Sequence, residues 1–341
     1  MDFKFKLGSD ISKLWFDYCL IDEKLEIIVK GNVSNSPEAI QEFINELLNL
    51  GIIKSISDIL LVIEHTGLYI NHLVKTWLSN GGRLSLIQAS KISIALDGGN
   101  SFEEKTDPMD ALRIAEYAVR FEDKLKLYEL SPEALISLKL LRAQRKRVIK
   151  SINLLTVPLN EIKAFESKEQ SDMLNELQHE VVQVAKTALK KINDKIKSII
   201  SNDINLQRLF KLISSVPGVG KVTAIEILIT TNGFTSFSPN QAKSFARFCG
   251  VVPLHKSSGK FKRKPKTSKK ANAKMKSLLT TGALSLLHTK SDLGRYYTRK
   301  KEQGKDHMTI INAMRNKIIL RVFAVVKNQT MYKRNFDIYL Q

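Results

Sequence analysis

The chain has 341 residues, 43% of them hydrophobic, so it is long enough to bury a sizeable core and, by length alone, to form two domains. It contains no run of about 20 apolar residues, and its first residues lack the apolar segment of a signal peptide, so we expect a cytoplasmic protein that does not span a membrane. Two cysteines and six scattered histidines argue against a disulfide framework and against a cysteine-rich zinc site.

Charge is divided unevenly along the chain. The formal net charge is +20, but residues 1–110 hold only 10 of the 54 Lys and Arg residues and 16 of the 34 Asp and Glu residues, a net charge of −6. Residues 111–341 therefore hold 44 basic and 18 acidic residues, a net charge of +26. Because neutralising phosphates supplies most of the energy of non-specific nucleic-acid binding, the basic part of the chain predicts a nucleic-acid partner.

The N-terminal third predicts an α/β domain with a mixed sheet. Three strand-like runs separated by short turns form a meander, and helices then alternate with strands. The predicted strands are 3–9, 15–22, 25–31, 58–64 and 84–90, and the predicted helices are 36–51, 69–82 and 105–121. Ser36 is a suitable N-cap for the first of these helices, with Pro37 at its first position.

From Ser131 onward the sequence predicts helices alone. One helix starts at 131–132 and a second covers about 172–201, where apolar residues recur at spacings of three and four, as in a coiled-coil seam. The seam residues are Leu174, Leu177, Val181, Val184, Ala188, Ile192, Ile196 and Ile199. Two interpretations stay open, a helical hairpin packed on its own domain and an arm that forms dimers.

Four acids are candidates for one catalytic site. In the predicted sheet, the end of the fourth strand, which carries Glu64, lies beside the middle of the first strand, which carries Asp10. Asp107 and Asp110 are three residues apart at a helix start and project from one face of its first turn. Converging carboxylates repel one another unless cations neutralise them, and Mg²⁺ prefers hard oxygen ligands. We therefore predict a two-metal phosphodiester site.

Each acid also has a simpler interpretation. Asp107 is a suitable N-cap, and the helix dipole favours an acid such as Asp110 in a first turn. Asp10 and Glu64 could be surface acids at strand ends. All four acids are placed at the edges of one predicted domain. This common placement favours the metal site, because the simpler interpretations do not require the four acids to lie near one another.

The sequence SSVPGVGKVTAIEIL, at 214–228, resembles a phosphate loop but fits neither common pattern. Thr223 stands where the dinucleotide fingerprint needs its third glycine, and Val222 follows Lys221 where the Walker pattern needs Ser or Thr. Two helices joined by Pro-Gly-Val-Gly indicate a helix-hairpin-helix instead, in which Gly218 and Gly220 let backbone N–H groups approach a phosphate beside Lys221. The alternative is a plain helical turn with a glycine cap.

Residues 256–276 carry ten basic residues and no acid. Such a run predicts phosphate contacts, with a solvated arm as the alternative. The basic residues assigned to nucleic-acid binding are Lys256, Lys260, Lys262, Arg263, Lys264, Lys266, Lys269 and Lys270. A serine of Ser257-Ser258-Gly259, held among these cations, could attack a phosphodiester, although a flexible turn explains the composition on its own.

Together these motifs resemble those of the DEDD-type insertion-sequence transposases, the family of bridge-RNA-guided recombinases. The motifs are GSDIS around Asp10, VIEHTG around Glu64, KTDPMDA around Asp107 and Asp110, SVPGVG, and SSGK, in this order over nearly the whole chain. The resemblance implies a RuvC-like domain of ribonuclease-H fold at 1–128, whose four acids bind Mg²⁺. It further implies a coiled-coil linker at 129–208 and a helical transposase domain with the helix-hairpin-helix at 209–341.

The resemblance also implies a mechanism and partners. Ser258, or the adjacent Ser257, would be the nucleophile that joins covalently to DNA during strand exchange. The carboxylate site of one protomer would work with the serine of another, in a dimer or tetramer. The family binds a structured non-coding RNA whose loops pair with donor and target DNA, so base pairing would read the sequence.

Two other functions stay open. In one, the chain is a metal-dependent DNA nuclease or junction resolvase in which Ser258 is inert. In the other, it is a non-catalytic nucleic-acid-binding protein that uses the basic part alone and is indifferent to Mg²⁺.

Overall fold

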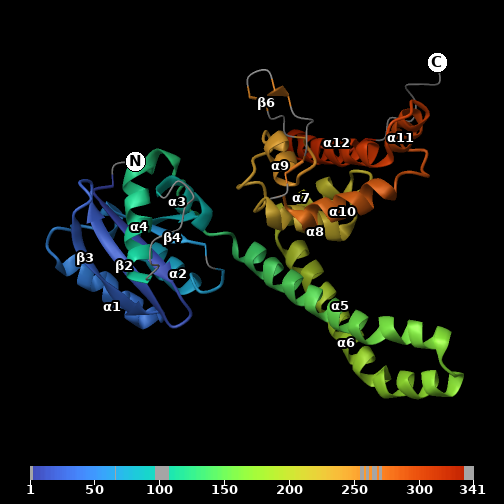
Figure 1. Cartoon of the computed structure of the whole chain (residues 1–341), viewed down its shortest axis with the longest axis horizontal. Helices are drawn as coiled ribbons and strands as arrows, with labels where there is room; N and C mark the ends of the chain where they lie inside the picture. The colour runs from blue at the N-terminus through green and yellow to red at the C-terminus, as the bar shows by residue number, and fades with distance from the viewer. Residues whose placement is uncertain are drawn as a thin grey trace. The chain divides into compact units, whose positions relative to one another are not determined.

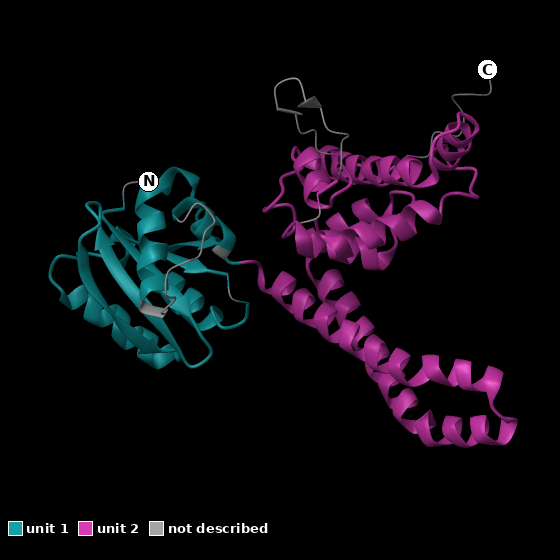
Figure 2. Cartoon of the chain, in the orientation of Figure 1, with its two compact units in different colours: residues 1–130 teal, residues 131–341 magenta. Residues whose placement is uncertain are grey.

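The computed structural model describes residues 3–65, 67–96, 107–253, 257–258, 261–262, 267–268 and 271–333. It divides into two compact units, residues 1–130 and 131–341 (Figure 2). In the described part of the chain, no helix combines the length and the apolar character that crossing a membrane requires.

The N-terminal unit is built on a five-stranded sheet. Its strands are β1 (Phe5–Ile11), β2 (Trp15–Asp22), β3 (Ile27–Ser34), β4 (Ile59–Glu64) and β5 (Arg83–Ile87). They lie in the order β3-β2-β1-β4-β5; β2 is antiparallel to β1 and β3, and β4 is parallel to β1 and β5. The predicted meander, the five strands and the mixed sheet are confirmed.

Helices cover both faces of this sheet. They are α1 (Pro37–Asn49), α2 (Asn71–Ser79), α3 (Ala89–Leu96) and α4 (Asp107–Arg120), with short 3₁₀ turns at Ile56–Asp58 and Glu122–Lys124. Side chains alternate along each strand, so Leu7 and Leu61 pack with α1 and α2 on one face. Helix α4 covers the other face (Figure 1), where Cys19 packs against Ala111 of α4. Helix α3, which was not predicted, begins at Ala89, so the predicted strand 84–90 is wrong for its last residues.

The C-terminal unit is mostly helical. A long antiparallel hairpin of α5 (Glu133–Phe165) and α6 (Lys168–Asn202) precedes α7 (Ile204–Ser214), α8 (Lys221–Thr230), α9 (Ala242–Phe248), α10 (Ala273–Leu284), α11 (Asp292–Glu302) and α12 (His307–Asn328) (Figure 1). The base of the hairpin, including Leu138 and Ile196, shares one core with the later helices.

Two short strands interrupt the helices. Strand β6 (Ser257–Ser258) pairs antiparallel with β7 (Phe261–Lys262). The expectation of helices alone after Ser131 is therefore wrong at this place, where the backbone forms a small hairpin.

The apolar residues of α6 form two stripes rather than the single predicted seam. Ile196 is buried and Ile192 is partly buried, whereas Leu177, Val181 and Val184 are 71%, 57% and 70% exposed. These three residues therefore do not pack inside the hairpin of a single chain, because spacings of three and four also occur along a second stripe on the same helix, and for them the dimer-forming interpretation of the seam stays a prediction. The hairpin therefore carries an exposed apolar stripe in addition to its internal contacts.

Candidate carboxylate site and nucleic-acid interface

Asp10 and Glu64 lie at the same end of two neighbouring strands. Strands β1 and β4 are parallel, with Ser9 opposite Ile63, so the next residue along each strand is Asp10 and Glu64 respectively. Alternation places both on the face of the sheet that α4 covers. Asp10 is the second-last residue of β1, so its predicted position in the middle of the strand is wrong. The two acids are nevertheless neighbours, as predicted, and they lie at the carboxyl ends of both strands.

A close contact between β1 and α4 brings the start of α4 to the same edge. A Cβ on Gly8 would lie 2.2 Å from the carbonyl oxygen of Ala111 and 2.4 Å from the backbone nitrogen of Ala115, so only glycine allows this approach. At the other end of β1, the Lys6 ammonium lies 2.9 Å from a carboxylate oxygen of Glu122, which follows α4. Helix α4 thus runs opposite to β1, and its first turn lies toward Asp10.

Strand β2 adds an acid that sequence reasoning missed. Asp17 is directly opposite Asp10 in the antiparallel pair and is 8% exposed. Residues directly opposite each other share a face, and Cys19, two residues later, packs against α4. The alternation of WFDYCLID could have placed Asp17 on this face, because its apolar neighbours alternate with it.

The four predicted ligands are only partly described. The side chain of Asp107 lies outside the described residues, whereas Asp10, Glu64 and Asp110 are all half-buried. No three His, Cys, Asp or Glu side chains in the described part of the chain are close enough to hold a metal ion. The carboxylates at this edge have the donor chemistry that suits Mg²⁺, but the four-ligand set stays a prediction.

The Pro-Gly-Val-Gly turn joins α7 and α8 as the sequence predicts, and it contacts α10 closely. The φ of Gly218 is +86°, in the left-handed region that favours glycine. Opposite it, a Cβ built on Gly282 of α10 would lie 2.0 Å from the carbonyl oxygen of Gly218, so position 282 also requires glycine. The turn and α10 therefore meet backbone to backbone.

The start of α8 is open to an anion. Among the described residues, no heavy atom beyond its chain neighbours lies within 4 Å of the position of a Cβ on Gly220, which is the N-cap of α8 and gives it no side-chain cap. Lys221 is exposed beside the free N–H groups of the first turn. A hollow of about 590 Å³ lies here between residues 218–223 and α10. The phosphate contact at this helix start stays a prediction.

Seven of the ten basic residues of this run lie outside the described residues. They are Lys256, Lys260, Arg263, Lys264, Lys266, Lys269 and Lys270, and the backbone alone is described for Lys262, Ser257 and Ser258. Both serines belong to β6, Ser257 opposite Lys262 and Ser258 opposite Phe261. Both serines therefore stay candidates for the nucleophile.

The two ends of the basic run are held together. The backbone N–H of Asn272 donates to the carbonyl of Phe248 at 2.9 Å, and a Cβ on Gly250 would lie 2.3 Å from the Cβ of Ala271. The side-chain amide of Asn312 on α12 donates to the carbonyl of Val251 at 2.7 Å. The run therefore leaves and re-enters the helical core at one place.

Two family models match the chain in separate segments. Residues 7–162 match a model described as a transposase, of the DEDD type from IS110 elements. Residues 210–298 match a model described as the transposase IS116/IS110/IS902 family. The first segment contains the four predicted acids, and the second contains the glycine turn and both serines.

Named relatives extend over nearly the whole chain. The pilin gene-inverting protein of Moraxella bovis is 24% identical, over 97% of this chain and 97% of its own length. The transposase for insertion sequence element IS1111A of Coxiella burnetii is 23% identical, over 96% of this chain and 91% of its own length.

Similarity to a solved structure is weak over the whole chain. RuvC of T. thermophilus in complex with a Holliday junction substrate is 13% identical and covers 36% of this chain and 99% of its own, with a TM-score of 0.29. The mixed sheet with helices on both faces defines the α/β class of the N-terminal unit. Because the two transposase models match in order along one chain, and the relatives align from end to end, the chain belongs to the IS110 family of insertion-sequence transposases.

Proposed function

We propose that this transposase cuts and rejoins DNA in a Mg²⁺-dependent reaction with a serine nucleophile, guided by an RNA. The observation that carries the proposal is the adjacency of Asp10 and Glu64 on parallel strands, beneath the first turn of α4, in a chain of a transposase family. Three segments far apart in sequence meet there, as a site built for one reaction requires.

In the proposed site, Asp10, Glu64, Asp107 and Asp110 hold the metal ions. Bound Mg²⁺ would neutralise charge on the attacked phosphate and its leaving oxygen. The protein's own contribution is rigidity. Asp10 and Glu64 extend from strands whose neighbouring residues are buried, and the Gly8 contact holds α4 against β1. Ligands on regular elements keep their geometry better than ligands on loops.

The serine step exchanges one phosphate ester for another. The Oγ of Ser258, or of Ser257, forms a bond to phosphorus while the bond from phosphorus to one bridging oxygen breaks. The serine proton leaves to a base or water, and the released DNA hydroxyl receives a proton. The reverse reaction with a second DNA hydroxyl rejoins the strand. The neighbouring Lys and Arg residues would stabilise the developing charge.

The proposed partners are donor and target DNA, a structured guide RNA and further copies of the chain. The net charge of +26 after residue 110 supports contact with two polyanions. The exposed stripe on α6, Leu177, Val181 and Val184, supports self-association through the hairpin, because apolar stripes of this kind are seldom left in water. In a dimer or tetramer, one protomer's carboxylates would work with another's serine.

A denaturing gel tests the proposal. The purified protein is incubated with Mg²⁺, RNA transcribed from its element's flank and matching DNA, and we expect a covalent protein–DNA band. Ser258→Ala or Ser257→Ala should remove the band, and the variant that does so identifies the nucleophile. Ser277→Ala, an exposed serine on α10, is the matched control.

Other results would select the alternatives. Cleavage without a covalent band would assign a metal-dependent nuclease or resolvase. A third result would assign a non-catalytic binding protein. In this result the DNA is not cleaved, binding depends strongly on salt, and neither Asp10→Asn nor chelation of Mg²⁺ changes the affinity.

A further inference from the structure

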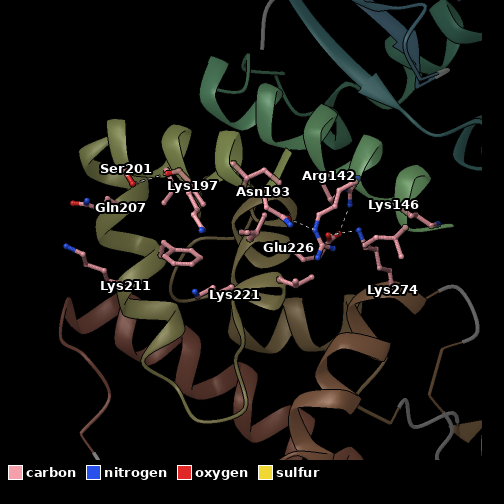
Figure 3. Close-up of a pocket in the computed structure, with 17 residues that line it drawn as sticks. Arg142, Lys146, Asn193, Lys197, Ser201, Gln207, Lys211, Lys221, Glu226 and Lys274 are labelled. Atoms are coloured by element: carbon pink, nitrogen blue, oxygen red, sulfur yellow. Dashed lines mark hydrogen bonds and ion pairs between the residues drawn. The ribbon is translucent and has the colours of Figure 1, made fainter. Parts of the chain in front are cut away.

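A hollow of about 680 Å³ lies where the base of the α5–α6 hairpin meets α7 and α8 (Figure 3). Its volume is in the range of about 300–1,000 Å³ that is usual for ligand sites. Apart from Lys221 and Lys274, which belongs to the basic run 256–276, none of the residues that line it was predicted from the sequence to contact a ligand. Its lining combines an apolar floor with a basic rim.

The floor is apolar and comes from four helices. Ile149 of α5, Ile196 of α6, Phe210 of α7 and Ile225 of α8 line it. Phe210 and Ile225 are half-buried at the margin of the C-terminal core. Apolar surface of this kind gains free energy when a flat apolar group covers it.

The only acid among the lining residues is already neutralised. Glu226 is 3% exposed, and its carboxylate oxygens lie 2.6 Å from Arg142 of α5 and 2.7 Å from Lys274 of α10 (Figure 3). The Nε of Arg142 is buried without a hydrogen-bond partner in the described part of the chain. Glu226 therefore leaves no net negative charge in the hollow.

The remaining cations of the rim are available to a ligand. Seven Lys and Arg residues line the hollow, and within the described residues Lys146, Lys211 and Lys221 form no ion pair. All three are exposed and carry their charges at the edge of the hollow (Figure 3). A ligand that matches the site has several negative charges and an apolar, flat part.

An unpaired nucleotide has this combination. Its phosphate matches the lysines, and its base can cover the apolar floor beside Phe210. A duplex keeps its bases stacked inside and presents phosphates, so it could use the rim but could not reach the floor. Lys221 and Val222 also line the smaller hollow at the Gly218 turn. A strand held at the start of α8 could therefore continue into the larger hollow.

We propose that the hollow between α5, α6, α7 and α8 binds unpaired nucleotides of a nucleic-acid strand, with bases on the floor and phosphates on Lys146, Lys211 and Lys221. The proposal rests on the proposed function only in requiring that the chain binds nucleic acid. Single-stranded DNA and single-stranded RNA share the chemistry that the site recognises.

Binding of short labelled oligonucleotides to the full chain tests the proposal. The probes are single strands of one sequence as DNA and as RNA, and the corresponding duplexes, without Mg²⁺. We expect single strands to bind more tightly than duplexes. Lys146→Glu with Lys211→Glu should weaken single-strand binding at least about tenfold. The control, Lys186→Glu with Lys190→Glu, makes the same charge change on exposed residues of α6 that do not line the hollow.

A fluorescent base analogue reports on the floor. Quenching of 2-aminopurine in the bound strand should be strong with the wild-type chain and reduced by Phe210→Leu, which keeps an apolar side chain but loses the ring. Loss of affinity of about tenfold is the expected scale for one lost stacking contact. The single strand that binds more tightly, DNA or RNA, identifies which nucleic acid the hollow prefers.

Several results would overturn the proposal. One is that single strands and duplexes bind with equal affinity, and another is that the rim and control variants lower the affinity equally. A third is that Phe210→Leu leaves the quenching of 2-aminopurine unchanged. An acidic peptide that binds with the same rim dependence while oligonucleotides do not would assign the hollow to a protein partner. Since these measurements need neither Mg²⁺ nor cleavage, absence of the covalent DNA band would leave their outcome unchanged.

Discussion

The N-terminal unit collects its candidate catalytic residues from three distant segments, whereas the C-terminal unit keeps its predicted contacts in two contiguous runs. Asp10 and Glu64 are neighbours because β1 and β4 are parallel, and the first turn of α4, which carries Asp110, lies toward them because α4 packs on β1. The glycine turn at 217–220 and the basic run at 256–276 are formed by local sequence. The comparison teaches that packing changes remote from the acids should damage the first site, while the second should be sensitive to packing mainly where Gly282 of α10 meets the glycine turn.

The two units share one structural device. In each, glycine lets two backbones approach closely, Gly8 against Ala111 in the N-terminal unit and Gly282 against Gly218 in the C-terminal unit. The first contact positions acids and the second positions the start of a helix. Perturbing each contact separately therefore tests whether the units contribute different activities.

The largest effect is expected at the carboxylates themselves. Asp10→Asn keeps the shape of the side chain but removes its charge, and we expect cleavage to fall by about 1,000-fold, since a metal ion contributes several kcal/mol to such reactions. Nucleic-acid binding should be unchanged. Cleavage and binding assays check this, with the exposed Glu42→Gln on α1 as control. Equal losses in both assays would argue against separate roles for the units.

The glycine contacts should give the next largest effects. Gly8→Ala and Gly282→Ala each introduce a Cβ about 2 Å from backbone atoms, so we expect each to destabilise its unit by about 3 kcal/mol. Gly8→Ala should reduce cleavage more than binding, and Gly282→Ala should reduce both. Denaturant unfolding with parallel cleavage and binding assays measures the effects.

Gly220→Ala is the control for these substitutions, because its Cβ would enter open space. We expect a stability change within about 1 kcal/mol there. A normal cleavage rate in folded Gly8→Ala would contradict the role given to the packing of α4 on β1.

A smaller effect is expected at the buried acid of the C-terminal unit. Glu226→Ala leaves Arg142 and Lys274 facing each other without a counter-charge, and we expect a loss of about 2 kcal/mol in unfolding free energy. The loss is lower than for a fully buried pair because both cations are at least one-third exposed and can turn toward water.

The exposed pair of Asp194 and Lys197 provides the contrast for Glu226. Asp194→Ala should change stability by less than about 0.5 kcal/mol, because both side chains are more than half exposed. Denaturant unfolding compares the two variants. A Glu226→Ala variant as stable as Asp194→Ala would show that Glu226 does not hold α5 and α10 to α8.

The smallest effect concerns the two buried thiols, one in each unit. Burial raises the pKa of Cys19 above its usual value, and burial raises that of Cys249 to about 12. Because the folded pKa lies above the unfolded value of about 8.5, the contribution of the thiol to stability is complete below that pH. It is lost as pH rises toward 12.

Measurements on Cys249→Ala isolate this contribution. The difference in unfolding free energy between wild type and variant should shrink as pH rises through this window. Neither thiol should react with an aromatic disulfide at pH 8 before unfolding. Rapid modification of native Cys249 would contradict its burial.

Much of the sheet could be predicted because strand alternation and turn residues are local signals. The adjacency of Asp10 and Glu64 followed from topology alone. By contrast, Asp17 was missed because predicting a strand at 15–22 does not give its register, and the register of β2 on β1 is what places Asp17 opposite Asp10. The exposed stripe of α6 was merged with the internal seam, because their spacings are the same.

The hollow and its ion pairs were not predictable, since their members are far apart in sequence. Glu226 lies between isoleucines, where an acid resembles a solvated position on a helix. Its partner Arg142 is 84 residues away on α5, and only the packed structure brings them together.

The most direct test of cooperation between the two units mixes two inactive variants. Asp10→Asn lacks a working carboxylate site and Ser258→Ala lacks the proposed nucleophile, so neither should form a covalent protein–DNA band alone. If the carboxylates of one protomer work with the serine of another, the mixture should restore the band, attached only to the Asp10→Asn chain, which a size tag can identify. No restoration in mixed oligomers, with each variant inactive alone, would contradict the shared site.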